Sequence, residues 1–154
     1  MPIEPHGIVP EPALADALVR HAFAVVPTEE VHDLGTEAGA IAALSLPGRI
    51  LFAAAASQTP ILVVGSDRTP AAAFVLRHGI GRVVPYDAAA FRAAARELRR
   101  PEVQAEARAR ASAIAPALSD EGVGPWLFGS VEDGRPRDDR FERLFPRGVA
   151  EAAA

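Results

Sequence analysis

The sequence lacks several residue types and patterns, and each absence narrows the class of protein. It contains no cysteine, which excludes disulfides and metal sites built on thiolates. Lysine is absent too, so all 16 basic residues are arginines, whose planar guanidinium suits phosphates and carboxylates. No apolar run approaches the roughly 18 residues of a membrane span. No secretory signal opens the sequence, so we expect a cytoplasmic protein.

Two classes of partner find little support in the sequence. The net charge is −4 and no basic stripe stands out, which is unfavourable for neutralising nucleic-acid phosphates. The four histidines are scattered without the spacing of metal ligands. We therefore expect no nucleic-acid partner, no metal and no other cofactor.

Apolar runs and turn residues predict strands that alternate with helices. The predicted strands are 23–27, 60–66 and 81–87, and the predicted helices are 11–22, 49–58, 70–78, 88–99 and 101–118. Residues 28–44 are interpreted as an acidic loop that can include a short helix. This alternation is typical of an α/β fold, here a Rossmann-like parallel sheet flanked by helices.

Three strands make a thin sheet, because this fold usually carries about five or six. Either the domain is small or this chain is part of a larger one, and residues 3–8 are a candidate for a further strand. The exposed edge of such a sheet would favour self-association into a homo-oligomer. We predict a Rossmann-like domain over residues 1–118 and a partly ordered C-terminal extension over 119–154, where the pattern weakens.

Parallel α/β sheets bind ligands beyond the carboxyl ends of their strands, and here those ends are polar. They are residues 27–30, 65–67 and 85–87. Glu29 and Glu30 follow the first strand, where they either hold a sugar or ribose hydroxyl or remain solvated loop charges.

The stretch SLPGR, residues 45–49, offers a second candidate element of a binding site. Ser45 is expected to cap the following helix, Gly48 to let a ligand approach the backbone, and Arg49 to match two phosphate oxygens. The alternative is an ordinary capped helix whose arginine faces solvent.

The order of these motifs resembles the second half of a two-domain (GT-B) glycosyltransferase. The resemblance is carried by HGIVPEPALADALVRHAFAVVPT, then SLPGRILFAAAASQTPILVVGS, then AAAFVLRHGIGRVVPYD, followed by two helices. It spans about residues 5–118. In that family the C-terminal domain binds a nucleotide-sugar donor, so the resemblance implies a partial donor domain with this function.

The resemblance also implies roles for particular residues. Ser45, Gly48 and Arg49 would face the donor diphosphate. The sugar or nucleoside would lie near Gly7, Ile8, Thr28, Glu29 and Glu30. The family has lysine at the position of Arg49, and it often has a ribose-binding glutamate where this sequence offers Phe52 and Ala53.

Transfer also needs an acceptor domain, which the resemblance implies is not part of this sequence. The chain alone is therefore expected to bind the donor without catalysing transfer. The alternative is a non-catalytic α/β binding or interaction module that keeps the fold without the chemistry.

Overall fold

A computed structural model describes residues 7–29, 36–141 and 144. The elements are α1 (Glu11–Val19), β1 (Ala24–Pro27), α2 (Glu37–Leu44), α3 (Gly48–Phe52), η1 (Ala53–Ser57), β2 (Ile61–Val64), α4 (Pro70–His78), β3 (Gly81–Val84), α5 (Ala88–Leu98), α6 (Pro101–Ile114), η2 (Ala115–Leu118) and α7 (Val123–Asp133). No helix among these combines the length and the apolar character needed to cross a membrane.

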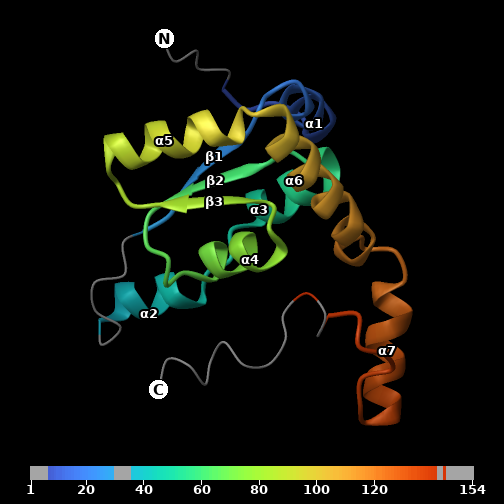
Figure 1. The fold of residues 1–154 in the computed structure, drawn as a ribbon. Coiled ribbons are helices and arrows are strands. Elements are labelled where there is room, and N and C mark those ends of the chain that lie inside the picture. The colour runs from blue at the N-terminus through green and yellow to red at the C-terminus, as the bar shows by residue number, and fades with distance from the viewer. Residues whose placement is uncertain (1–6, 30–35, 142–143, 145–154) are drawn as a thin grey trace.

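The three strands form one parallel sheet in the order β1-β2-β3, which Figure 1 shows at the centre of the molecule. The central strand β2 is buried at all four positions, as expected for a strand with neighbours and helices on every side. The prediction of an α/β fold with a parallel sheet flanked by helices is therefore confirmed.

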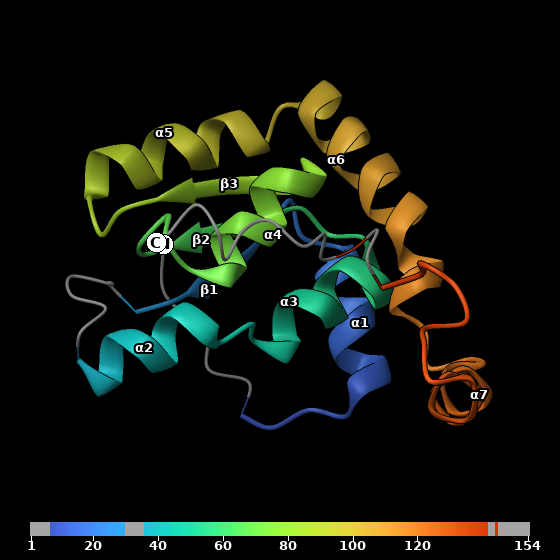
Figure 2. The same ribbon diagram turned by 90° about the horizontal axis from the view of Figure 1, so that it is seen from below.

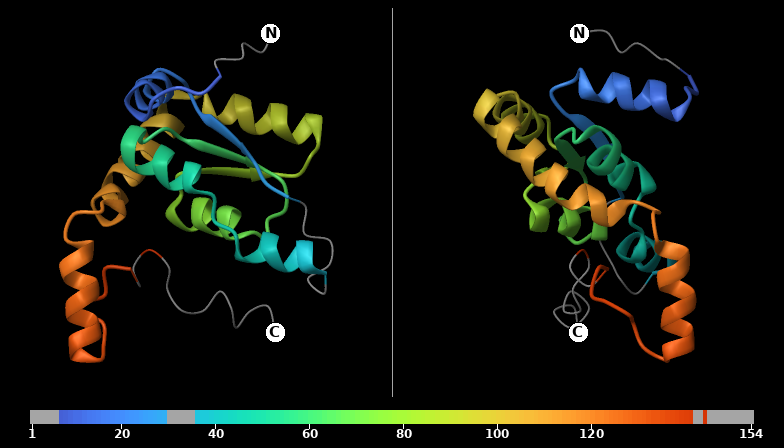
Figure 3. Two further views of the ribbon diagram at one scale, coloured as in Figure 1. Left: turned by 180° about the vertical axis from the view of Figure 1, so that it is seen from behind. Right: turned by 90° about the vertical axis from the view of Figure 1, so that its right-hand side faces the viewer.

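Alternation along β2 divides the core into two layers. Ile61 and Val63 pack with Ile50 of α3 and Phe74 of α4 on one face of the sheet. Leu62 and Val64 lie on the other face, in a cluster completed by Val84 of β3 and by Ala94 and Leu98 of α5. Figures 1 and 3 show α5 on the opposite side of the sheet from α3 and α4.

Local signals explain why α4 spans its predicted residues. Thr69 is the N-cap and its Oγ1 accepts a hydrogen bond from Ala72 N, while Pro70 occupies the first turn. Gly79 ends the helix with φ +62°, a left-handed conformation that glycine adopts without strain.

Three predicted segments differ from the structure. The helix expected over 49–58 is a short α-helix that continues as a π-helical turn, in which Ser57 Oγ donates to Ala53 O. The extension after 118 contains a regular helix, α7, bounded by two left-handed glycines, Gly122 and Gly134. Residues 7 and 8 are not in a strand, and the rest of the strand considered over 3–8 lies outside the described residues.

Candidate functional site

A cleft of about 620 Å³ lies beyond the carboxyl ends of the strands. Residues from five parts of the chain line it: Pro27, Thr28, Glu29, Ile41, Ser45, Pro47, Arg49, Thr69 and Tyr86. Helix α2, which contributes Ile41, lies on the side of the sheet toward which the strands point (Figure 2). The cleft thus unites the first strand end with the SLPGR turn, two segments that the sequence singles out separately.

Arg49 supplies the positive charge among these described lining residues, and its side chain is held toward the sheet. Its Nη2 donates a hydrogen bond of 2.7 Å to the carbonyl oxygen of Pro27, the last residue of β1. Arg49 forms no ion pair with another described residue. The guanidinium therefore lies against the strand end with its positive charge available to a ligand in the cleft.

The SLPGR turn is built differently from the sequence-based expectation. Ser45 is the C-cap of α2, whereas the N-cap of α3 is Pro47, which makes no side-chain capping bond. The prediction that Ser45 caps the following helix is therefore wrong, because α2 uses this residue to end. Ser45 still lines the cleft, and Gly48 is exposed with no atom within 4 Å of where a Cβ would stand.

Thr28 joins the ends of all three strands. Its N–H donates to Val64 O at 2.8 Å, which extends the β1–β2 pairing by one residue. Tyr86 follows β3 in the sequence, and its Oη donates a hydrogen bond to Thr28 O at 2.8 Å. Gly65 has φ +146°, and a Cβ there would lie 2.7 Å from Thr28 O. The close approach of Thr28 therefore requires glycine at position 65 and sets the shape of the cleft floor.

Glu29 places a carboxylate in the same cleft as Arg49. No hydrogen bond or ion pair joins this carboxylate to another side chain in the part of the chain that the structure describes. The cleft therefore combines a hydrogen-bond acceptor with a cation and with four side chains that carry hydroxyls, those of Thr28, Ser45, Thr69 and Tyr86.

Two of the remaining predicted site residues are described, and neither lines the cleft. Gly7 and Ile8 do not line the cleft, and Ile8 is fully exposed. Glu30 lies outside the described residues. The sequence placed Tyr86 among the polar residues at the strand ends and indicated Thr69 as a helix cap, and neither was given a role in binding. The signal for Tyr86 was its position directly after a strand of the same parallel sheet.

Among the described residues, no group of three or more His, Cys, Asp or Glu side chains could hold a metal ion. No protein-family model, curated protein or solved structure matches the chain. A function for this chain therefore has to be inferred from the chemistry of the cleft itself.

Proposed function

We propose that the cleft binds a nucleotide-activated sugar and that the chain is the donor-binding part of a glycosyltransferase of the GT-B type. The observation that carries the proposal is the position of Arg49, whose guanidinium is fixed at the carboxyl end of β1 inside the cleft. The volume of the cleft, about 620 Å³, falls within the range of about 300–1,000 Å³ that is usual for small-molecule sites.

Arg49 is the group proposed to bind the diphosphate. The bond to Pro27 uses one of the five N–H groups of a guanidinium, and it fixes the orientation of the fork in advance. A charge-assisted hydrogen bond from this guanidinium to a phosphate oxygen would contribute about 1.5–3 kcal/mol to binding. The same cation would stabilise the nucleoside diphosphate as it leaves the sugar, where negative charge develops.

Glu29 is proposed to bind a hydroxyl of the sugar or the ribose. An ionised carboxylate is an acceptor only, so it pairs with hydroxyl donors and repels phosphate. A ligand with phosphate at one end and hydroxyls at the other matches a cleft that carries both Arg49 and Glu29. In this proposal the acceptor and the groups that activate it come from a separate domain, so the chain alone binds without transferring.

A second candidate is a non-catalytic binding or interaction module, and one observation favours it. The position at which the resemblance would place a ribose-binding carboxylate is occupied by Phe52 and Ala53, and Ala53 is buried in the core. In this alternative the contact between Arg49 and Pro27 is structural only.

Ligand binding to the intact chain separates the two candidates. Isothermal titration and thermal shift with UDP, GDP, ADP, their sugar derivatives and inorganic pyrophosphate should reveal one preferred nucleotide. A ligand at about 100 times its Kd would add about 2.7 kcal/mol to stability. Arg49→Ala should lower the affinity for that ligand by at least about tenfold, because the substitution removes a charge-assisted hydrogen bond.

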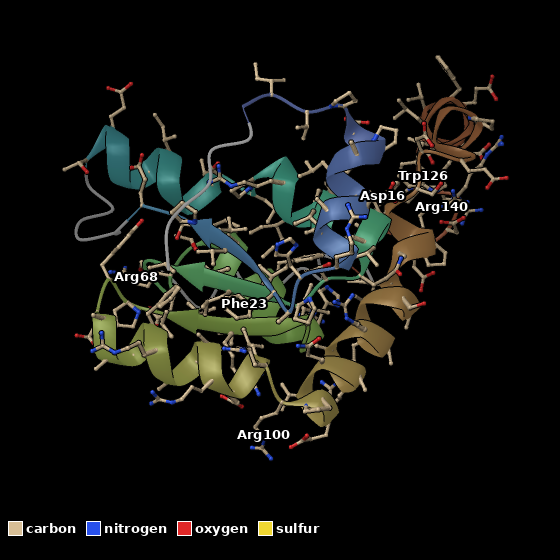
Figure 4. All side chains as sticks on the ribbon, turned by 90° about the horizontal axis from the view of Figure 1, so that it is seen from above. Asp16, Phe23, Arg68, Arg100, Trp126 and Arg140 are labelled. Carbon is tan, nitrogen blue, oxygen red and sulfur yellow. The ribbon has the colours of Figure 1, made fainter. Side chains whose placement is uncertain are left out.

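The matched control is Arg68→Ala. Arg68 is exposed on the loop between β2 and α4, at the same end of the sheet, but it does not line the cleft (Figure 4). Arg68→Ala should leave the nucleotide affinity within about twofold of wild type, since an exposed charge outside the site is screened. No stabilisation by any nucleotide would reject the donor-domain proposal and favour the interaction module.

A further inference from the structure

The Tyr86 side chain connects the two outer strands at the carboxyl end of the sheet. Tyr86 follows β3, and its Oη donates a hydrogen bond to the carbonyl oxygen of Thr28, which follows β1. Because β2 lies between these strands, the bond is made across the end of β2 (Figure 1). The residue that follows β2 is Gly65, which contributes no side chain there. The Tyr86 ring thereby becomes part of the lining of the cleft.

The Tyr86 ring is held in place although much of it is exposed to solvent. The residue is 57% exposed. Its hydroxyl is bonded to Thr28 O, and its backbone is held as well, because Asp87 N donates to Pro85 O at 2.7 Å and Asp87 caps α5. A tethered side chain loses little further conformational freedom when a ligand binds to it. Tyr86 therefore offers a flat, preorganised aromatic surface in the cleft.

The cation and this ring are bonded to neighbouring residues at the end of β1. Arg49 donates to the carbonyl oxygen of Pro27, and Tyr86 donates to that of Thr28. Thr28 directs its N–H toward β2, so Tyr86 approaches from the side of β3, whereas Pro27 directs its carbonyl away from β2 and receives Arg49 of α3. The end of β1 thus lies between the cation and the ring, and Glu29 follows directly after it.

The groups of a nucleoside diphosphate occur in the same order as these side chains. Such a molecule has anionic phosphates at one end, ribose hydroxyls in the middle and a flat base at the other end. Arg49 suits the phosphates, and the Glu29 carboxylate accepts hydrogen bonds from hydroxyls. The hydroxyl proton of Tyr86 is already used by Thr28 O, so the ring itself remains as its binding surface, and aromatic rings stack on flat π systems.

The composition of the lining indicates which kind of base fits. The described lining residues include no Asn or Gln, the side chains whose amides pair with the edge of a base. Stacking on an aromatic ring accepts every base, because each base has a π face. The affinity then depends on the stacked area, which is larger for the two fused rings of a purine.

Building on the proposed nucleotide-sugar site, we propose that Tyr86 is the stacking surface for the base of the bound nucleotide and that this base is a purine. The ribose lies over Thr28 and Glu29, and the diphosphate lies at Arg49. The resemblance would instead place the nucleoside near Gly7 and Ile8, but neither residue lines the cleft. The stacking role is therefore assigned from the position of Tyr86 in this structure.

Calorimetric titration with ADP, GDP, UDP and inorganic pyrophosphate tests the role of the ring. Tyr86→Leu should lower the affinity for ADP and GDP by at least about fivefold, because base stacking is lost. Its affinity for pyrophosphate should stay within about twofold of wild type, since pyrophosphate has no base. Tyr86→Phe keeps the ring but not the bond to Thr28 O, so its affinity for the two purine nucleotides should be intermediate.

The matched control is Phe128→Leu, which also removes an exposed aromatic ring. Phe128 is 71% exposed on α7 and does not line the cleft. All four affinities should therefore stay within about twofold of wild type. Far-UV circular dichroism verifies that each variant folds.

A second measurement uses the unaltered chain and does not depend on any variant. The sequence contains a single tyrosine, so ring-labelled tyrosine gives NMR signals from Tyr86 alone. ADP should shift these ring signals upfield and give nuclear Overhauser contacts between the ring and the base protons. Pyrophosphate should give neither effect.

The outcomes separate this inference from the proposed function. Purine nucleotides that bind wild type and Tyr86→Leu equally well, or that leave the Tyr86 signals unchanged, would overturn the stacking role and leave the nucleotide site in place. UDP that binds as tightly as ADP and GDP would overturn the assignment of a purine. If no nucleotide binds the wild-type chain, the proposed function is rejected and the stacking role with it.

Discussion

The Arg49 guanidinium donates to the carbonyl oxygen of Pro27 at 2.7 Å, and this contact also affects the free edge of the sheet. Ala24 and Thr28 donate their N–H groups toward β2, so Val25 and Pro27 direct their backbone groups outward. Pro27 has no N–H and its carbonyl is bonded to Arg49. Val25 is therefore the residue of β1 with both backbone groups toward that edge, which limits pairing with another strand. Self-association through this edge stays a prediction.

The first prediction separates the two roles of Arg49. Arg49→Gln keeps an amide N–H donor on a shorter side chain but removes the positive charge. The melting temperature should stay within about 2 °C of wild type, because the side chain is exposed. Nucleotide affinity measured by calorimetry should fall by at least about tenfold. Affinity equal to wild type would show that the charge of Arg49 does not contribute to binding.

The second prediction contrasts two glycines at the same end of the sheet. Gly65→Ala places a Cβ against Thr28 with φ at +146°, so it should cost about 2–4 kcal/mol of unfolding free energy. Gly48→Ala has open space and a helical position, so stability should be unchanged or rise by up to about 1 kcal/mol. Urea denaturation measures both. Equal effects of the two substitutions would contradict the role given to Thr28.

Gly48→Ala has a further use in ligand titrations. If a bound phosphate approaches the backbone at Gly48, the added methyl group should reduce affinity although stability is preserved. Unchanged affinity would place the ligand nearer Arg49 and Tyr86 than the backbone of α3.

Local sequence signals predicted the sheet and the position of the cleft. The unbroken apolar run of β2 identified a strand covered on both faces, and Thr69, Pro70 and Gly79 fixed the limits of α4. The rule that ligands bind at the carboxyl ends of parallel strands identified Thr28 and Glu29 as candidate site residues. These features depend on residues close together in sequence.

The features that sequence reasoning missed depend on tertiary contacts or on mixed patterns. Tyr86 becomes part of the cleft through a bond to Thr28, a residue 58 positions earlier. Ser45 and Pro47 are both plausible helix boundaries, and in the structure Ser45 ends α2 while Pro47 precedes α3. The apolar residues of α7 are divided between two faces, with Trp126 on one and Phe128 on the other. The sequence therefore has no single apolar stripe that predicts this helix.

The third prediction concerns two helix caps that differ in burial. Thr69 is 2% exposed, and its hydroxyl accepts from Ala72 N and donates to Ser66 O. Thr69→Ala should therefore cost about 1–2 kcal/mol, whereas Thr69→Ser should retain most of the stability. Asp87 caps α5 from an exposed position, so Asp87→Ala should cost less, about 0.5–1 kcal/mol. Chemical denaturation measures the unfolding free energy of each variant. A larger loss for Asp87→Ala than for Thr69→Ala would contradict this account.

The fourth prediction is a pH dependence that arises from His78. Burial lowers the pKa of His78 below its ordinary value of 6.5, against the opposing effect of a hydrogen bond to Leu144 O. The unfolded chain therefore binds a proton more readily than the folded one at pH values below 6.5. The stability contributed by neutral His78 is complete above that pH and is lost as the pH falls through the folded pKa.

His78→Gln retains an N–H at the ε position but does not titrate, so its unfolding free energy should fall less steeply between about pH 7 and pH 5. Glu97→Gln is the control for a different pH window. The hydrogen bond from Arg82 lowers the pKa of Glu97 below 4.5, so the stability that depends on this carboxylate is lost only under more acidic conditions. Urea midpoints measured at intervals across both windows distinguish the two groups. Parallel pH profiles for wild type and His78→Gln would assign the dependence to groups other than His78.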